Sequence, residues 1–285
     1  MIWGKICSLY RFFPWLKFGS THYWSVPIQL YKKIAMQLEI NFLGGNMTDI
    51  EYLKKYLSEE KLEDGLKRLE KGEPVQYIVG NVDFYGYTFN VNPCVLIPRF
   101  ETEELVSKTI EYANIVFKET FKAVDVGTGS GCIAITLKKK LRDKIDMSAV
   151  DISKAALEVA QLNAKENDVQ IKFYHGDMLD PLDEKFDLII SNPPYIRKDE
   201  EIMKIVRDNE PSIALYADND GLENYEKILS AAKNYLNQKN MIAFEIGWWQ
   251  GPRVVEIAKK YFPNALIKIE KDMQEKDRFV FIFNK

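Results

Sequence analysis

A glycine-rich turn stands where an apolar stretch at 123–126 meets a helix-forming stretch at 132–141. Glycines let the backbone turn sharply and approach a ligand closely, and the free N–H groups at a helix N-terminus favour a carboxylate or a phosphate. Position 132, where a dinucleotide-binding fingerprint has its third glycine, is Cys132. The spacing therefore points away from NAD. The residues of the turn are Gly127, Thr128, Gly129, Ser130 and Gly131.

An acidic residue closes the next apolar stretch of the chain. Asp151 follows residues 147–150 and stands twenty positions after Gly131. A carboxylate at the end of the second strand can accept hydrogen bonds from the two hydroxyls of a ribose. The turn and the acid together predict a ligand that contains adenosine. The alternative is an ordinary β–α turn followed by a surface aspartate.

A third motif follows the apolar stretch 186–190. In open α/β sheets, ligands bind beyond the carboxyl ends of the strands, so this motif and the glycine turn should face one crevice. The side-chain oxygen of the asparagine and the carbonyl of the first proline can accept both N–H bonds of a carboxamide or an exocyclic amine, and the tyrosine ring can pack against the flat group. The alternative is a plain Pro-Pro turn. The residues are Asn192, Pro193, Pro194 and Tyr195.

Strands and helices alternate after residue 100, which predicts an α/β doubly wound domain over 100–285. The two strands nearest the C-terminus lie too close together for a helical crossover, so we expect them to pair antiparallel at one edge of the sheet. The predicted strands are 123–126, 147–150, 171–174, 188–191, 241–246, 266–269 and 279–283, and the predicted helices are 132–141, 154–167, 222–236 and 253–261.

Three segments precede this domain. Residues 47–73 carry apolar side chains at three-to-four spacing among charges, which predicts a small helical cap. The pattern in 74–99 shifts toward alternation, with turn-forming residues at 85–86, and predicts a β-hairpin linker. Residues 1–46 are aromatic-rich but lack a helical period.

Charge and cysteine usage narrow the function. Five basic residues and one acidic residue give 1–46 a net charge of +4, which leaves −7 for the rest of a chain whose total is −3. A core of that charge disfavours a nucleic-acid partner, because nucleic-acid binders neutralise phosphates with basic side chains. Three scattered cysteines and two histidines form neither a disulfide framework nor a metal site. We therefore expect a cytoplasmic protein without a metal.

Cys132 and His175 are the residues near the predicted crevice that could be mistaken for catalytic groups. Cys132 falls in an apolar helical stretch and is expected to be a buried helix residue rather than a nucleophile. His175 follows a predicted strand and is interpreted as a structural strand-end residue rather than a general base.

Together, the three motifs resemble the class I S-adenosylmethionine-dependent methyltransferases that act on planar nitrogen. The upstream segments 72–80, 84–86 and 96–103 are similar to those of the HemK/PrmC family of protein-(glutamine-N5) methyltransferases. This resemblance extends from about residue 70 to the C-terminus, with further matches at 210–211, 221–222, 245–247 and 271–278. It implies a Rossmann-like, mostly parallel seven-stranded sheet with an antiparallel C-terminal edge hairpin, preceded by a small N-terminal helical domain, here the cap at 47–73, which would bind substrate.

The resemblance also implies roles for the motifs. Residues 127–131 would hold the methionine end of S-adenosyl-L-methionine, Asp151 the ribose, and Asp177 and Met178 the adenine, with Asn192 also beside the cofactor. Residues 192–195 would receive the glutamine of the GGQ motif in class I peptide chain release factors. The protein would then act as a monomer, without a membrane or direct contact with nucleic acid. Glutamine of a ribosomal protein and adenine of DNA or RNA remain alternative substrates.

Two parts of the chain depart from that family. Phe100 stands where members usually have a proline, next to Arg99. Residues 1–46 have no counterpart, and their charge is opposite to that of the rest. We expect translation to begin at Met47, with 1–46 as upstream sequence; the alternative is a basic, aromatic arm that lies on a membrane surface.

Overall fold

The computed structural model describes residues 48–284. The expectations for 1–46 and for a start at Met47 lie outside these residues. Helix α3 (Asp49–Tyr56) and helix α4 (Glu59–Glu70) form the predicted helical cap, in which Leu53 is fully buried against Val75 and Ile78. The amphipathic spacing of the segment is therefore used to build a small separate core.

The linker contains a short helix that its alternating pattern did not predict. Helix α5 (Val75–Val79) begins after Pro74 and ends at Gly80, whose φ of 88° is the left-handed conformation that terminates helices. The turn buries the apolar side chains that had suggested a strand. The hairpin follows as predicted, with β1 (Asn81–Phe84) paired antiparallel to β2 (Tyr87–Asn90). Positive φ at both turn residues gives it the hairpin geometry that matches strand twist.

The main sheet has seven strands in the order β5-β4-β3-β6-β7-β9-β8. The five strands from β5 to β7 are parallel, whereas β9 pairs antiparallel with both β7 and β8, so the predicted edge hairpin is confirmed. The strands are β3 (Phe121–Val126), β4 (Ile145–Asp151), β5 (Lys172–His175), β6 (Phe186–Ser191), β7 (Leu236–Glu245), β8 (Leu266–Lys271) and β9 (Asp277–Asn284).

The chain reverses its direction across the sheet between β3 and β6, because β4 and β5 lie on one side of β3 and β6 and β7 on the other. Such a switch point opens a crevice at the carboxyl ends of the two strands. The glycine turn follows β3 and the Asn-Pro-Pro-Tyr loop, residues 192–195, follows β6. The topology therefore brings both motifs to one place.

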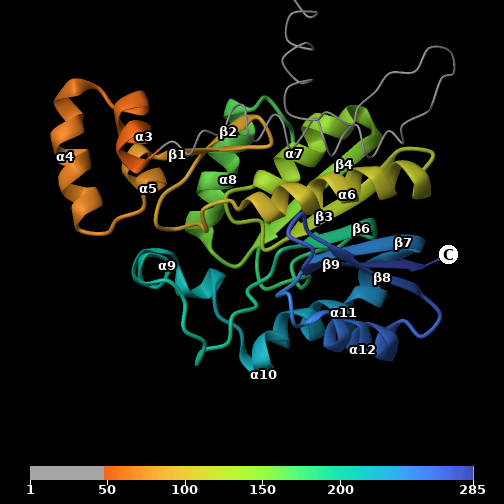
Figure 1. Ribbon diagram of the computed structural model, residues 1–285. Helices are drawn as coiled ribbons and strands as arrows, with labels where there is room; N and C mark the ends of the chain where they lie inside the picture. The colour runs from red at the N-terminus through yellow and green to blue at the C-terminus, as the bar shows by residue number, and fades with distance from the viewer. Residues whose placement is uncertain (1–47, 285) are drawn as a thin grey trace, which may run out of the picture. The chain divides into compact units, whose positions relative to one another are not determined.

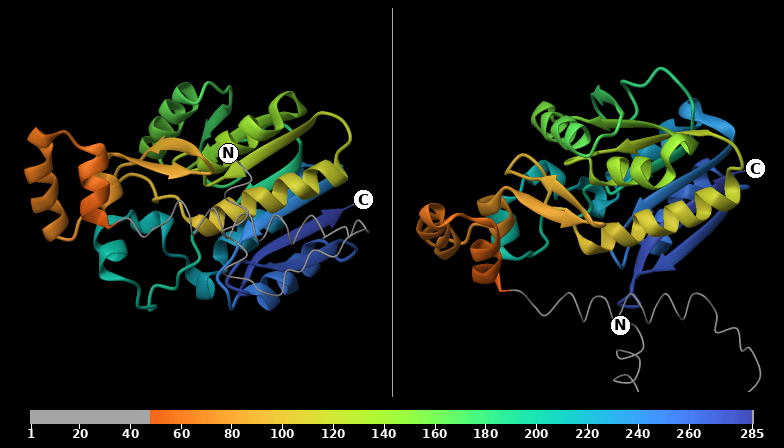
Figure 2. Two further views of the ribbon diagram at one scale, coloured as in Figure 1. Left: turned by 45° about the horizontal axis from the view of Figure 1, so that its top comes forward. Right: turned by 90° about the horizontal axis from the view of Figure 1, so that it is seen from above.

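Helices cover both faces of the sheet. In Figure 1, α6 (Phe100–Val116), α7 (Cys132–Leu141) and α8 (Lys154–Glu166) lie on one face, and α11 (Glu223–Tyr235) and α12 (Gly251–Tyr261) on the other. The two views of Figure 2 show the same layers, with the hairpin joining the cap to α6. Phe100 is the first residue of α6, a position that also suits proline, so helix α6 begins here without the proline that the family usually has.

Short elements complete the fold. The 3₁₀-helix η1 (Arg142–Lys144) leads into β4. Between β6 and α11 the chain forms α9 (Lys204–Asn209), the 3₁₀-helix η2 (Ser212–Ala214) and α10 (Asp218–Gly221). Asn209 donates to the carbonyl of Gly72 at 3.0 Å, and Arg99 forms an ion pair with the buried Glu210. These contacts tie the α9 segment to the cap and to the linker.

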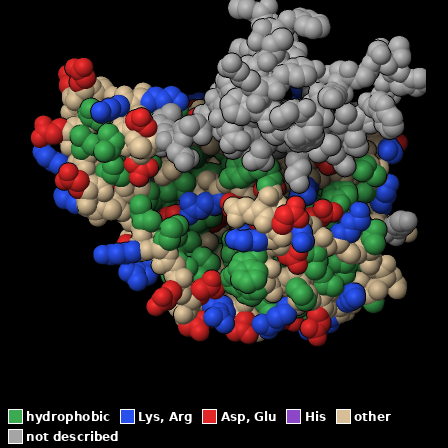
Figure 3. Space-filling view, in the orientation of Figure 1, with side chains coloured by type: hydrophobic (Ala, Val, Ile, Leu, Met, Phe, Trp, Pro, Cys, Tyr) green, Lys and Arg blue, Asp and Glu red, His purple; other side chains and the backbone are tan. Residues whose placement is uncertain are grey.

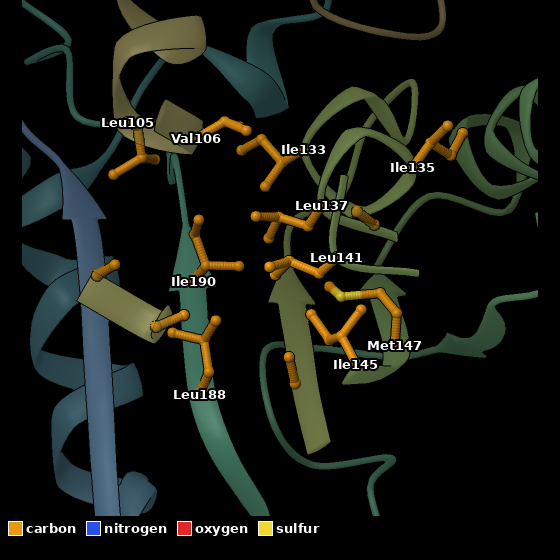
Figure 4. Close-up of a cluster of buried hydrophobic side chains, with 14 of the residues drawn as sticks. Leu105, Val106, Ile133, Ile135, Leu137, Leu141, Ile145, Met147, Leu188 and Ile190 are labelled. Carbon is orange, nitrogen blue, oxygen red and sulfur yellow. The ribbon is translucent and has the colours of Figure 1, made fainter. Parts of the chain in front are cut away.

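The core between sheet and helices is mostly apolar. Figure 4 shows Leu137 and Leu141 of α7, with Leu188 and Ile190 of β6 and Ile145 of β4, filling the space between helix and sheet. Four of these five side chains are at most 1% exposed, and Leu141 is 8% exposed. Close packing of this kind fixes where each strand ends, and therefore where the site residues stand.

Candidate active site

The glycine turn, residues 127–131, is hydrogen-bonded to the end of the neighbouring strand β4. The N–H groups of Gly127 and Thr128 both donate to the carbonyl of Val150, at 2.9 and 3.0 Å, and Gly131 donates to Thr128 at 2.8 Å. All three glycines have positive φ, between 56° and 81°, which a side chain would disfavour. Three of the N–H groups of this turn are therefore bonded within the protein, and the expectation that others at the start of α7 meet a ligand stays a prediction.

Asp151 connects the turn to the next strand. Its Oδ2 accepts the N–H of Gly129 at 2.8 Å and its Oδ1 accepts the N–H of Ser153 at 2.8 Å. Burial raises the pKa of this carboxyl, and the backbone hydrogen bonds oppose the rise. A carboxylate has about four acceptor sites, and backbone N–H groups of Gly129, Ile152 and Ser153 use three, so one remains for a ligand.

A cavity of about 290 Å³ opens above the turn. Asp177 and Met178 line it, and Met178 has a φ of 44°, a strained conformation for a side chain of this size that is typical of functional sites. The predicted residues on its wall are Gly127, Gly129, Asp151, Asp177, Met178, Asn192 and Pro194. Thr128, Ser130 and Gly131 do not line it; Thr128 and Ser130 are buried, and Gly131 is the N-cap residue of α7.

The lining of the larger cavity fits S-adenosylmethionine. A Cβ atom at Gly127 or Gly129 would meet no heavy atom within 4 Å, so a ligand can lie directly against this backbone. Asp151 offers an acceptor for a ribose, and Ile152 and Met178 offer apolar surface for a flat base. The residues present therefore fit the predicted cofactor.

Replacing Asp151 with alanine should weaken S-adenosylmethionine binding by about 1–3 kcal/mol, because the ribose loses a charged acceptor and the Gly129 N–H loses its partner. Calorimetry measures the effect. Asp146→Ala is the matched control, since Asp146 lies on the same strand but forms only an exposed ion pair with Lys172. If the two variants bind S-adenosylmethionine equally tightly, Asp151 is not a cofactor-binding residue.

The Asn-Pro-Pro-Tyr loop is fixed by side chains from several elements. Ser191 Oγ donates to the carbonyl of Val126 at 2.6 Å, which joins the ends of β6 and β3. Asn224 of α11 donates to the Pro194 carbonyl at 2.9 Å, and Gln250 donates to the Tyr195 carbonyl at 3.3 Å. Within residues 48–284, by contrast, no donor is bonded to the carbonyl of Pro193. That acceptor remains available for a substrate.

A smaller cavity of about 90 Å³ adjoins the first. Both are lined by Asn192 and Pro194, and the smaller one also by Pro193, Tyr195 and Glu245. Asn192 Nδ2 donates to Thr102 Oγ1 at 3.1 Å, so its amide is already held on one side. Asn192 and Pro194 thus stand where the two cavities share their lining, called here the junction, and Pro193 and Tyr195 line the smaller cavity beside them.

Sequence reasoning missed several residues that support this site. Thr102, Asn224 and Gln250 each bond a residue of the loop from far away in the chain. Asp125 is fully buried below the glycine turn, accepts from Thr128 Oγ1 at 2.7 Å, and has its pKa raised by burial to about 7. Glu245 is an acid directly after an apolar strand, as Asp151 is, and that signal could have identified it.

The two residues excluded from catalysis have structural surroundings. Cys132 is 7% exposed, and burial raises the pKa of its thiol to about 12, which leaves it an unreactive thiol near neutral pH. His175 ends β5 and its Nε2 lies 3.0 Å from the carbonyl of Ile152. Both observations agree with the interpretation from the sequence.

Further features bear on partners. Among the described residues, no three His, Cys, Asp or Glu side chains are grouped closely enough to hold a metal ion. No helix within residues 48–284 has the length and apolar character needed to cross a membrane. On the face drawn in Figure 3, acidic and basic side chains are interspersed around the sheet domain rather than segregated.

The fold and the two adjoining cavities define a class I S-adenosylmethionine-dependent methyltransferase. Residues 105–209 match the methyltransferase small domain family. A solved methyltransferase from Pyrococcus furiosus shares the fold, with a TM-score of 0.51 and 17% identity over 78% of this chain and 98% of that one. The 16S rRNA N2 G1207 methyltransferase of T. Thermophilus, solved with S-adenosylmethionine and guanosine, has a TM-score of 0.53 and 17% identity, covering 72% and 50%.

Sequence similarity is more specific. The release factor glutamine methyltransferase of Bacillus subtilis (strain 168) is 44% identical over 218 residues, which cover 74% of this chain and 75% of that protein. The chain belongs to the family of release factor glutamine methyltransferases, and its cofactor is S-adenosylmethionine. The resemblance stated from the motifs is thereby confirmed.

Proposed function

We propose that this protein methylates the side-chain amide nitrogen, N5, of the GGQ glutamine in class I peptide chain release factors. The observation that carries the proposal is the pair of acceptors at the junction of the two cavities. The Pro193 carbonyl lacks a partner among the described residues, and the Asn192 amide is held on one side by Thr102. The name of the Bacillus subtilis relative supplies the substrate.

The chemistry needs little more than positioning. An amide nitrogen is a poor nucleophile because its lone pair is delocalised into the carbonyl. When Asn192 and Pro193 accept its two N–H bonds, the lone pair points out of the amide plane, and in-line placement lowers the barrier. Both hydrogen bonds strengthen as positive charge develops on the nitrogen, so they stabilise the transition state more than the ground state.

Each bond that forms in the methyl transfer is matched by a bond that breaks. S-adenosylmethionine, when bound, supplies a methyl group on a positively charged sulfur. The N–C bond forms as the S–C bond breaks, and the methylated amide then loses one proton to water. The Tyr195 ring packs beside the flat amide during this step. No residue of the chain forms a covalent bond, and no metal ion takes part.

The same proposal places the protein in the cytoplasm as a monomer, without direct contact with nucleic acid. The net charge of −7 after residue 46 and the interspersed surface charges of Figure 3 support a protein substrate over DNA or RNA. Glutamine of a ribosomal protein uses the same chemistry, so the substrate itself must be identified by experiment.

Incubation with methyl-labelled cofactor and a class I release factor should add one methyl group, about 14 Da from the mass of CH₂, to the GGQ glutamine. A release factor with that glutamine changed to alanine should accept none, because the nucleophile is gone, and mass spectrometry of the peptide decides. Ribosomal proteins and adenine-containing DNA are the controls. Label in either of them, with none in the release factor, would replace the proposed substrate.

A further inference from the structure

Glu245 is a buried carboxyl group that the chemistry above does not use. It ends β7, is 2% exposed, and lines the smaller cavity together with Asn192 and Pro193. Its Oε2 accepts a hydrogen bond from Thr102 Oγ1 at 2.7 Å. Thr102 in turn accepts from Asn192 Nδ2 at 3.1 Å. The three side chains, called here the Glu245–Thr102–Asn192 chain, come from β7, α6 and the loop after β6.

The direction of donation in this chain follows from counting hydrogens. A carboxylate has none to donate, so the single hydroxyl hydrogen of Thr102 must point at Glu245. Thr102 can then only accept from its other neighbour, so the NH₂ group of Asn192 must face it. The side-chain oxygen of Asn192, a residue that lines both cavities, is therefore turned away from Thr102 and accepts no hydrogen bond within residues 48–284. An ionised Glu245 fixes which end of the amide meets the substrate.

We propose that Glu245 is a positioning residue that, directly and through Thr102, holds the NH₂ group of Asn192 and so leaves its side-chain oxygen for the substrate amide. The inference rests on the proposed function for the identity of the substrate, but the orientation of Asn192 is a property of the protein alone. A protonated Glu245 can itself donate to Thr102, which frees the hydroxyl hydrogen for the oxygen of Asn192. The amide can then turn its NH₂ group toward the substrate, where two donors would oppose each other.

Several groups around Glu245 set its protonation. Burial raises its pKa to about 7, and the hydrogen bonds from Thr102 and Asn192 and the charge of Arg278 oppose the rise. Arg278 also forms an ion pair with Asp272, in which 3.2 Å separates Nε from Oδ2. The titratable groups that face Glu245 are Glu101 on α6, Cys132 on α7, Tyr195 after β6, Tyr225 on α11 and Arg278 on β9. Glu245 therefore ionises within the physiological range, as pH rises through about 7.

The test compares Glu245→Gln with the wild-type chain in single-turnover methyl transfer between pH 5.5 and 8.5. The wild-type rate should exceed that of the variant by about 10-fold at pH 8.5 and equal it at pH 5.5, the size of one modest hydrogen-bond effect. Asp125 is present in both proteins, so its effect on the rate cancels in the ratio of the wild-type rate to the variant rate. KM for the cofactor should not change. Thr102→Ser should keep the wild-type profile, whereas Thr102→Val, which leaves only the direct bond from Asn192 to Glu245, should weaken the pH dependence.

Glu104→Gln is the matched control. Glu104 lies on α6, is 7% exposed, and has its pKa raised by burial, but it accepts from the backbone of Met273 and not from Thr102. The wild-type chain and Glu104→Gln should transfer the methyl group at equal rates across the pH range. A ratio for Glu245→Gln that is independent of pH, or an equal effect of Glu104→Gln, would overturn the proposal.

Two measurements separate positioning from unfolding and from a wrong substrate. The raised pKa means that ionising Glu245 lowers folding stability progressively between its unfolded value and about pH 7, so Glu245→Gln should melt at the wild-type temperature or above it at pH 8.5. The side-chain ¹⁵N resonance of Asn192 should titrate near pH 7 in the wild type and not in Glu245→Gln. A resonance that titrates identically in both sinks the inference even if release factors prove not to be the substrate.

Discussion

Asn192→Ala should slow methyl transfer to the release factor by about 100- to 1,000-fold, the effect of removing one transition-state hydrogen bond. The variant keeps the cofactor cavity but loses the side-chain acceptor at the junction, so the amide lone pair is no longer aimed at the sulfur-bound methyl group. Cofactor affinity should change much less, because the Asn192 side chain is only one part of that wall. The expected signature is a fall in kcat and kcat/KM together.

Single-turnover kinetics and calorimetry measure the two effects separately. Asn237→Ala is the control, because Asn237 lies at the opposite end of the sheet from the site, near the start of β7, and bonds only Asp187 and Asn240. It should methylate at the wild-type rate. Near wild-type transfer by Asn192→Ala would show that the lone-pair argument is wrong.

Gly221→Ala should both inactivate the protein and destabilise it. A Cβ atom at Gly221 would stand 2.1 Å from the carbonyl oxygen of Tyr195 and 2.7 Å from Gln250 Nε2, so both contacts must give way. The backbone of Gly221, with φ +76°, also disfavours any side chain. Left-handed strain and local overpacking together predict a loss of about 3 kcal/mol in the free energy of unfolding. The Asn-Pro-Pro-Tyr loop would shift at the same time.

Gly86→Ala separates the two causes. Gly86 has nearly the same φ, +78°, but a Cβ atom there meets nothing within 4 Å. Urea denaturation should show a loss of about 1 kcal/mol for this variant, from backbone strain alone, and its methyl transfer should stay normal. If Gly221→Ala proves as stable and as active as Gly86→Ala, the Tyr195 carbonyl does not depend on the glycine.

Residues at the carboxyl ends of strands could be predicted from the sequence. The glycine turn, Asp151 and the loop after β6 each follow an apolar stretch, and parallel strands bring such ends to one crevice. The hairpin was predictable for a similar reason, since Tyr85 and Gly86 form a local turn. In each case the signal lies within a few residues of the feature.

The remaining features depend on contacts that no local pattern reveals. Helix α6 was not predicted, because its buried face includes Thr102, Glu104 and Thr109, polar residues that interrupt the apolar stripe. Thr102 has its partner Glu245 143 positions away. Helix α5 was missed because its apolar residues suit either a strand or a buried turn of helix. The support of Asn192 is therefore a tertiary property.

The position of β9 between β7 and β8 has a consequence for the order of folding. Strands β3 and β4 are joined by α7 and can pair through contacts that are local in the sequence, and they carry the glycine turn and Asp151. Strand β7 pairs with β9 only after the chain has passed through α12 and β8. Such non-local pairing is slow, because a long loop must close first. Glu245, at the end of β7, should therefore reach its place beside Thr102 later than Asp151, at the end of β4, reaches its place beside the glycine turn.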